Sequence, residues 1–158
     1  MTKILILAGG YSNEREISLI TAKSVIYELK KNKKYKILLI EPDGSFVKKL
    51  RKFKPNLVLN LLHGRYGEDG YIQSILESEK VRYSHSGVLS SSLAIDKEIS
   101  KKIFTENNIL TPPHIKFSFK NNSNIKNTIK KIDRNFKFPV VLKPINEGSS
   151  VGVYICTK

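Results

Sequence analysis

Cysteine and long apolar runs are nearly or wholly missing from this chain of 158 residues. Cys156 is the only cysteine, so an internal disulfide is excluded and a reducing compartment is favoured. No apolar run approaches the roughly 20 residues of a membrane span. The N-terminus also lacks the basic region and cleavage site of a signal peptide. We therefore expect a cytoplasmic protein with no membrane partner.

Acidic residues are scarce: 14 stand against 28 lysines and arginines, which gives a formal net charge of +14. An excess of this size raises the question of a nucleic-acid partner. However, only five of the basic residues are arginines, and no basic stretch is interleaved with aromatic residues. The lysines recur instead on the polar faces of expected helices. We therefore predict no nucleic-acid binding.

Two common nucleotide-binding signatures are also absent. The sequence contains no G-x-x-x-x-G-K-[ST] motif, which excludes a Walker A loop. No G-x-G-x-x-G follows the first expected strand, which argues against a dinucleotide site. Internal repeats are missing as well.

The first part of the chain alternates between short apolar runs and helical patterns. Strands are expected at 3–8, 36–40 and 57–62, and helices at 14–31 and 47–53. Asn13 and Glu16 have the spacing of a capping box for the longer helix. Its predicted inner face consists of Ile17, Ile20, Ser24, Val25 and Leu29. This order predicts a parallel sheet with helices on its faces.

The remaining elements predict a second domain that begins near residue 111. Before it we expect a helix over 71–78, a short strand at 81–83 and a helix over 93–106. The last helix would be capped by Ser90–Ser92. Its inward-facing residues would be Leu93, Ile99, Ile103 and Phe104. Thr111-Pro112-Pro113 is a stiff linker. Beyond it we expect a strand at 114–119, a loop at 121–124, a helix at 125–136 and a hairpin of 140–142 with 151–155. We therefore assign 1–110 to one domain and 111–158 to an incomplete second one.

The ends of the first and third strands carry the most informative polar residues. In parallel sheets, ligands bind at the carboxyl ends of the strands. The first strand leads into residues 9–16, which include Glu14, and the third leads into 63–70, which include His63 and three glycines. If the two strands are neighbours, Glu14 and His63 overhang one crevice.

The connection at 146–150 of the expected hairpin is small, polar and glycine-bearing. Gly148 lets the backbone come close to a ligand, and Ser149 and Ser150 offer hydroxyl and N–H donors. Lys143 adds a mobile positive charge. These features are typical of a loop that folds over phosphates, and an ordinary surface hairpin is the alternative.

Five segments together resemble the D-alanine-D-alanine ligase family of the ATP-grasp superfamily. They are GGYSNEREISLITA, LHGRYGEDGYIQSILE, SHSGVLSSSLAIDK, TPP and FPVVLKPINEGSSVGV. The resemblance implies an α/β fold. A Rossmann-like, parallel-sheet pre-ATP-grasp domain would be followed by the first, incomplete part of an ATP-grasp α+β domain. It also implies that the chain is the N-terminal part of a longer protein.

In function, the resemblance implies ATP-dependent joining of two D-alanine molecules through an acyl phosphate, to supply the dipeptide for peptidoglycan. Mg²⁺ or Mn²⁺ would assist, but the family's metal ligands have no counterpart in these residues. We therefore expect no metal site within this chain and no ligase activity from the 158 residues alone. The family also suggests a homodimer.

The resemblance assigns roles to individual residues. Glu14 resembles the carboxylate that holds the ammonium of the first D-alanine, His63 the imidazole near that alanine's carboxylate, and Ile17 part of its methyl pocket. Ser149 resembles the loop serine that hydrogen-bonds Glu14. The implied ATP-binding residues are Lys97, Lys143, Glu147, Gly148, Ser149 and Ser150.

Two other readings remain open. The first is a related ligase that joins D-alanine to D-lactate or D-serine, because the residues that select the second substrate would lie outside this chain. The second is a non-catalytic nucleotide-binding or basic interaction module, for which salt-dependent DNA binding would be the sign.

Overall fold

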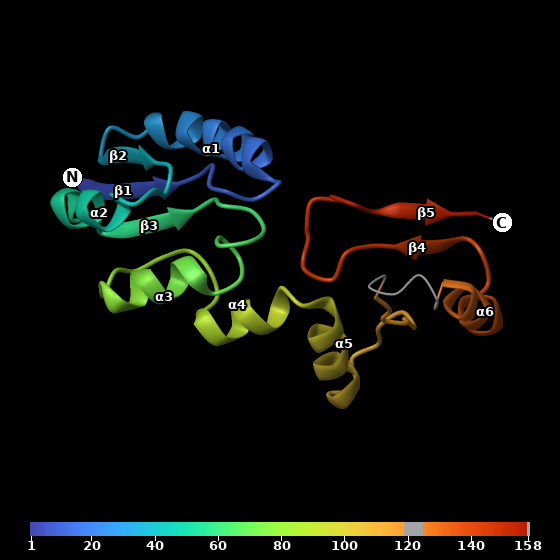
Figure 1. The fold of residues 1–158 in the computed structure, drawn as a ribbon. Coiled ribbons are helices and arrows are strands. Elements are labelled where there is room, and N and C mark those ends of the chain that lie inside the picture. Colours follow the sequence, from blue (N-terminus) through green and yellow to red (C-terminus); the bar gives the residue numbers. More distant parts are fainter. Residues whose placement is uncertain (119–124, 158) are drawn as a thin grey trace.

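The computed structural model describes residues 1–118 and 125–157 as two lobes joined end to end (Figure 1). The elements of the first lobe are β1 (Thr2–Leu7), α1 (Arg15–Lys30), β2 (Tyr35–Ile40), α2 (Phe46–Phe53), β3 (Leu57–Asn60), α3 (Tyr71–Ser78) and α4 (Val88–Ala94). Then follow α5 (Lys97–Glu106), α6 (Ile125–Asn135), β4 (Val140–Leu142) and β5 (Tyr154–Cys156). Among these helices, none combines the length and apolar character needed to cross a membrane.

The first lobe is built on a three-stranded parallel sheet in the order β2-β1-β3. Ile4 of β1 lies opposite Ile37 on one side and Leu57 on the other. A single parallel bridge between Val58 and Tyr83 stands where a short strand is expected at 81–83. The parallel sheet predicted from the alternating pattern is therefore confirmed, and β1 and β3 are neighbours.

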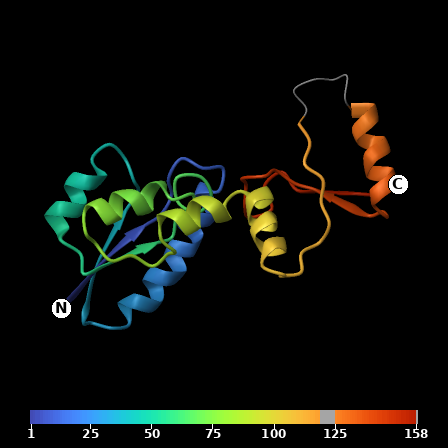
Figure 2. The same cartoon turned by 90° about the horizontal axis from the view of Figure 1, so that it is seen from below.

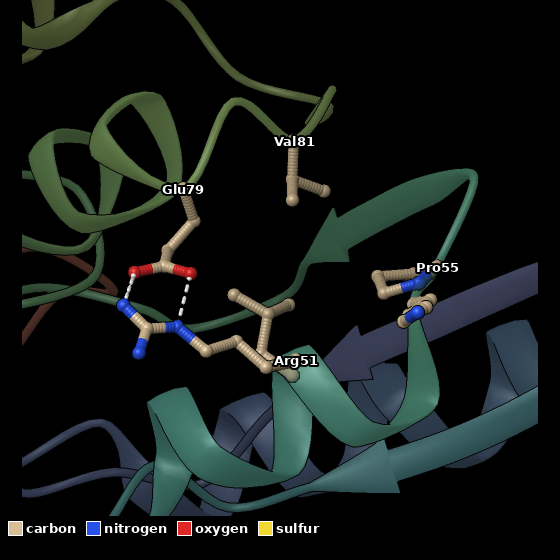
Figure 3. A pocket seen from close by; sticks show the side chains of 6 residues that line it. Arg51, Pro55, Glu79 and Val81 are labelled. Atoms are coloured by element: carbon tan, nitrogen blue, oxygen red, sulfur yellow. Dashed lines mark hydrogen bonds and ion pairs between the residues drawn. The ribbon is translucent and has the colours of Figure 1, made fainter.

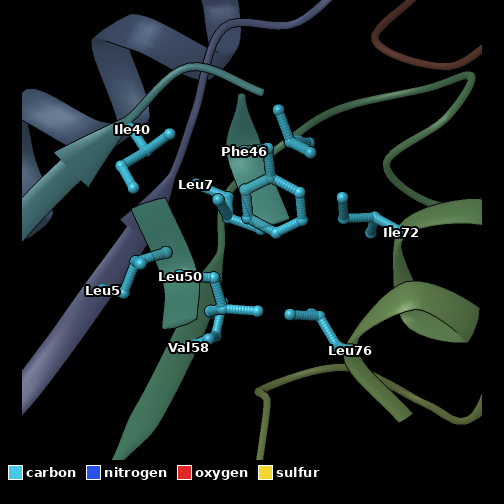
Figure 4. Close-up of a cluster of buried hydrophobic side chains, with 9 residues drawn as sticks. Leu5, Leu7, Ile40, Phe46, Leu50, Val58, Ile72 and Leu76 are labelled. Carbon is cyan, nitrogen blue, oxygen red and sulfur yellow. The ribbon is translucent and has the colours of Figure 1, made fainter. Parts of the chain in front are cut away.

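Two apolar clusters cover the two faces of the sheet. One lies between the sheet and α2 and α3, and its buried members are Leu5, Leu7, Ile40, Phe46, Leu50, Val58, Leu62, Ile72 and Leu76 (Figure 4). The other lies under α1 and contains Ile4, Ile6, Ala8 and Ala22. Successive β1 side chains point to opposite faces. The central strand is therefore apolar throughout, as expected for a parallel sheet covered on both sides.

The start and the inner face of α1 differ from the prediction. The helix begins at Arg15 with Glu14 as its N-cap residue, and the capping box of Asn13 with Glu16 does not form. Ser12 ends the preceding turn instead, because its carbonyl accepts the Arg15 N–H. The buried positions are Ser18 and Ala22. Ile17 and Ile20 are 39% and 63% exposed, whereas Val25 and Leu29 pack against the cluster under α1 as predicted, so only part of the predicted inner face points to the sheet.

The single helix predicted for 93–106 is wrong, because two helices occupy this region. The α4 helix ends at Ala94, and the side chain of Asp96 accepts hydrogen bonds from the N–H groups of Glu98 and Ile99 to start α5. An aspartate at an N-cap competes with helix continuation, which explains the break. Ile99 and Phe104, expected to face inward, are 37% and 42% exposed.

The second lobe consists of α6 and an antiparallel pair of β4 with β5, in which Val141 lies opposite Ile155 (Figure 2). The helix and the hairpin are confirmed, but the second strand begins three residues later than predicted. The N–H groups of Val151 and Val153 bond to the carbonyls of Gly148 and Ser150, and so belong to the connecting turns.

The strand predicted at 114–119 does not form over its described residues, 114–118. His114 pairs instead with Glu98 of α5 at 2.9 Å, which holds the linker against that helix. Phe119 and the predicted loop at 121–124 lie outside the described residues. The domain boundary at residue 110 stays a prediction.

Candidate active site

Three connections meet at the carboxyl edge of the parallel sheet. They are the loop after β1, the loop after β3 and the turn between β4 and β5, which reaches back from the second lobe (Figure 1). The N–H of Gly148 donates to Glu14 Oε1 over 3.1 Å and joins the two lobes directly. The hairpin therefore also borders the edge at which the crevice was expected, and this edge is called the crevice below.

Glu14 is the buried charge at the centre of this crevice. It is only 1% exposed, and Oε2 has no hydrogen-bond partner within the described part of the chain. A Cβ at Gly64 would come within 2.6 Å of Oε1, and one at Gly148 within 3.1 Å. Two glycines therefore clear the space that the carboxylate occupies. A buried carboxylate with a free oxygen is costly unless it meets a cation, so it is suited to bind one.

Ser12 fixes Glu14 relative to His63. Its hydroxyl donates to the His63 carbonyl at 2.7 Å and accepts the Glu14 N–H at 3.1 Å. One side chain thus connects the loop after β1 to the loop after β3. Sequence reasoning missed this residue. A short polar residue two positions before an N-cap is the signal that could have found it.

Ser18 makes a second connection one turn along α1. Fully buried, it accepts the Gly9 N–H at 2.8 Å and donates to the Leu61 carbonyl at 2.6 Å. The ends of β1 and β3 are thereby joined through a single hydroxyl. This residue was also not predicted from the sequence as part of the site.

The ring of His63 lies against α1. Its Nε2 is 3.3 Å from Thr21 Oγ1, whose own proton is donated to the Ile17 carbonyl at 3.0 Å. Because Thr21 has no second proton to give, His63 Nε2 acts as the donor in this pair. The His63 ring therefore lies next to the part of α1 that carries Ile17 and Thr21. The predicted methyl pocket at Ile17 stays a prediction.

Lys97 ties α5 to the hairpin. Its Nζ donates to the carbonyls of Ile145 (3.0 Å) and Glu147, and its backbone N–H also bonds to Ile145. Burial lowers the pKa of Lys97, and the charge of the nearby Lys143 lowers it further. Two ammonium groups that disfavour each other are suited to an anion that would neutralise both.

The turn at Ser149 and Ser150 has an unusual backbone. Both residues are exposed and lie in the left-handed region, with φ of 43° and 62°. The Ser149 hydroxyl makes no hydrogen bond to residues 1–118 or 125–157. The contact with Glu14 expected from this hydroxyl is made here by the Gly148 N–H. The role of Ser149, like that of Ser150 and Glu147 in ATP binding, therefore stays a prediction.

Metal-binding clusters are absent from the described ranges: no three His, Cys, Asp or Glu side chains there are placed to hold an ion. These residues thus do not fit Mg²⁺ or Mn²⁺ by themselves.

Two surface hollows lie outside the crevice. One of about 330 Å³ is lined by Leu50, Arg51, Lys54, Pro55, Glu79 and Val81 (Figure 3). It is located where β3 begins, at the sheet edge opposite Glu14, and the Arg51–Glu79 ion pair crosses it. The other, of about 510 Å³, is lined by Glu68, Ser84, His85, Ser86, Ser90, Ser91 and Ala94. It adjoins the loop after β3. We place the chemistry at Glu14, because within residues 1–118 and 125–157 it is the one buried carboxylate with an oxygen that makes no hydrogen bond.

Comparisons with known proteins find D-alanine–D-alanine ligases. A family model described as "D-ala D-ala ligase C-terminus" matches residues 103–158. A D-alanine–D-alanine ligase of Pelagibacter ubique is 62% identical over 99% of this chain and 50% of its own length. The chain therefore spans about half the length of the curated relatives it matches.

Solved structures give the same result. A crystal structure of the D-alanine–D-alanine ligase from Bacillus anthracis matches all of this chain and 50% of its own, with a TM-score of 0.78 and 37% identity. The same enzyme complexed with ATP matches with a TM-score of 0.74 and 33% identity over 99% of this chain and 51% of its own. Over nearly its whole length, this chain is therefore similar to about half of a D-alanine–D-alanine ligase.

Proposed function

We propose that these residues bind the first substrate and part of the ATP in an ATP-dependent ligase that joins two D-alanines for peptidoglycan. The observation that carries the proposal is the buried Glu14 carboxylate, whose Oε2 has no partner among the described residues. The ammonium of an amino acid supplies the missing cation. The names of the relatives supply the substrate, D-alanine.

In this proposal, the chain positions the substrate for two steps. A carboxylate oxygen of the first D-alanine attacks the γ-phosphorus of ATP, and ADP leaves. The amine of the second D-alanine then attacks the acyl carbon, loses a proton and expels phosphate. Glu14 holds the first ammonium, and the His63 imidazole lies near the carboxylate of the same D-alanine.

Lys97, Lys143 and the N–H groups of the 147–150 turn would contact the nucleotide phosphates. The like charges of Lys97 and Lys143 favour an anion between them, which supports this assignment. Because the turn already contacts Glu14, the hairpin would cover both substrates and exclude water from the acyl phosphate.

A metal ion, Mg²⁺ or Mn²⁺, would supply charge neutralisation at the transferred phosphoryl group. The described residues offer no ligand set for it, so no step here is routed through a metal. We therefore expect the 158 residues alone to be inactive. The cytoplasmic location and the homodimer stay predictions, as does the absence of nucleic-acid binding.

The test is product formation by a protein of the relatives' full length that carries these residues. With ATP and D-alanine we expect equal amounts of phosphate and D-alanyl-D-alanine, measured by coupled phosphate release and mass spectrometry. The 158-residue chain assayed in parallel should release none. A product with D-lactate or D-serine that outweighs the D-alanine product would favour the related ligases instead. Phosphate release that does not depend on any D-amino acid would contradict the proposal.

A further inference from the structure

The amide of Asn60 is a hydrogen-bond node behind the loop that carries His63. Asn60 ends β3 and is fully buried. Its Oδ1 accepts the Leu62 N–H at 3.2 Å, and its Nδ2 donates to the Gly67 carbonyl at 2.8 Å. A flipped amide would place oxygen against oxygen and N–H against N–H. The backbone therefore fixes which side of Asn60 donates.

This orientation fixes the protonation of His85. The ring Nδ1 of His85 lies 3.0 Å from Asn60 Nδ2, which is the donor side of the amide. His85 Nδ1 must therefore accept, so the proton of the neutral ring is on Nε2. A protonated ring would place an N–H at Nδ1 against the NH₂ group. The contact is therefore compatible with neutral His85 only.

The charged groups that face His85 are Glu68 and His63. Burial lowers the pKa of His85; Glu68 opposes this shift, and His63 adds to it. The α4 helix borders the same hollow with the uncharged Ser90, Ser91 and Ala94. Neutral His85 is thus favoured at pH 7, and protonation sets in below its ordinary value of about 6.5.

The loop held by this pair is the one that shapes the crevice. Gly67 receives a second hydrogen bond at 2.8 Å, from the buried Gln73, and Glu68 Oε2 accepts the Gly64 N–H at 2.7 Å. Gly64 in turn packs against Glu14. Release of Asn60 from His85 would therefore loosen the wall next to the Glu14 carboxylate.

We propose that His85 is a positioning residue: its neutral Nε2–H form holds residues 61–70 through Asn60, and its protonation weakens binding of the first amino acid. The binding half of this inference rests on the proposed function, whereas the tautomer and its coupling to the loop do not.

The first test is imidazole ¹⁵N NMR on this chain, which contains only three histidines. We expect His85 to show a protonated Nε2 and a bare Nδ1 at pH 7.5. Its pKa should lie below 6.5, and the Gly64 and Gly67 amide signals should titrate with it. His85→Asn and His114→Asn assign the signals. A proton on Nδ1, or glycine amides that ignore the His85 titration, would overturn the proposal whether or not the chain is part of a ligase.

The second test compares two replacements in a protein of the relatives' full length. His85→Asn keeps an acceptor near Nδ1 that does not titrate, so the rise of the first D-alanine KM below pH 6.5 should disappear. His85→Leu removes the acceptor. Its KM for the first D-alanine should lie about fivefold above that of the parent at neutral pH, the value of one hydrogen bond of about 1 kcal/mol, and should no longer change with the His85 titration, with the ATP KM unchanged. His114→Asn is the control and should behave as the parent. If the KM for the first D-alanine still rises below pH 6.5 in His85→Asn, the rise belongs to another group, such as His63, and the proposal is overturned.

Discussion

Gly148 donates its backbone N–H to Glu14 Oε1 over 3.1 Å, a contact between residues 134 positions apart in the chain. It places the turn of the second lobe on the carboxylate of the first. The position of the hairpin and the charge that binds substrate are therefore linked. Loss of either partner should affect both the crevice and its cover.

Gly64→Ala should displace Glu14. The residue has φ of 66°, and an added Cβ would come within 2.6 Å of Glu14 Oε1. The left-handed backbone alone costs a non-glycine residue about 1–2 kcal/mol. We expect this loss in denaturant unfolding together with a raised KM for the first D-alanine. Gly44→Ala is the matched control, because its Cβ would meet nothing within 4 Å. Equal effects of the two substitutions would contradict the account.

The sheet and its edge were predictable because they depend on local pattern. The continuous apolar run of β1 indicated burial on both faces, and parallel order placed Glu14 and His63 at one edge. The break between α4 and α5 was missed although Asp96 is a favoured N-cap residue, because apolar residues at helical spacing continue on both sides of it.

The hydrogen bonds that the serine hydroxyls make across the site could not be predicted from the sequence either. The hydroxyl of Ser12 donates to a carbonyl 51 positions along the chain, and that of Ser18 to one 43 positions along. No periodic pattern in the sequence marks such partners. The same applies to the Gly148 contact. A glycine in a polar turn predicts close approach, but what it approaches depends on how the two lobes sit together.

Ser149→Ala should slow turnover without altering the fold. The exposed hydroxyl contributes no hydrogen bond inside the described ranges, so its predicted role belongs to the closed complex with ATP. We expect a reduced kcat with an unchanged midpoint of thermal unfolding. Ser149→Gly removes the hydroxyl but relieves the left-handed backbone, and should lower kcat similarly. An unaltered kcat in both variants would show that the hydroxyl is dispensable.

Lys97→Met and Lys143→Met should differ in their effect on stability. Both should raise the KM for ATP, because each removes a charge near the phosphates. Only Lys97→Met should also lower the thermal midpoint, since Lys97 donates to the Ile145 and Glu147 carbonyls. The exposed side chain of Lys143 has no hydrogen bond to the part of the chain that is described. Equal loss of stability in both would contradict the bridging role of Lys97.

Asp43 should contribute to stability in a defined acid window. A hydrogen bond from Lys49, with further bonds from Ser45, lowers the pKa of Asp43 to about 2. A lowered carboxyl pKa stabilises the fold above the unfolded value of 3.8, and this contribution is lost as the pH falls through about 2. Asp43→Asn should therefore flatten the pH dependence of the unfolding free energy between pH 4 and pH 2, measured by urea titration. An unchanged slope in that window would contradict the assignment.

The most direct test is steady-state kinetics of Glu14→Gln in a protein of the relatives' full length. The substitution keeps the shape of the side chain and removes the charge that would pair with an ammonium. We predict that the KM for the first D-alanine rises about 10- to 100-fold, the value of a hydrogen bond to a charged group, while the KM for ATP changes little. Glu16→Gln, on the exposed side of the same turn, should behave as the parent. An equal rise of both KM values in Glu14→Gln, or no rise in either, would contradict the claim that this carboxylate binds the substrate ammonium.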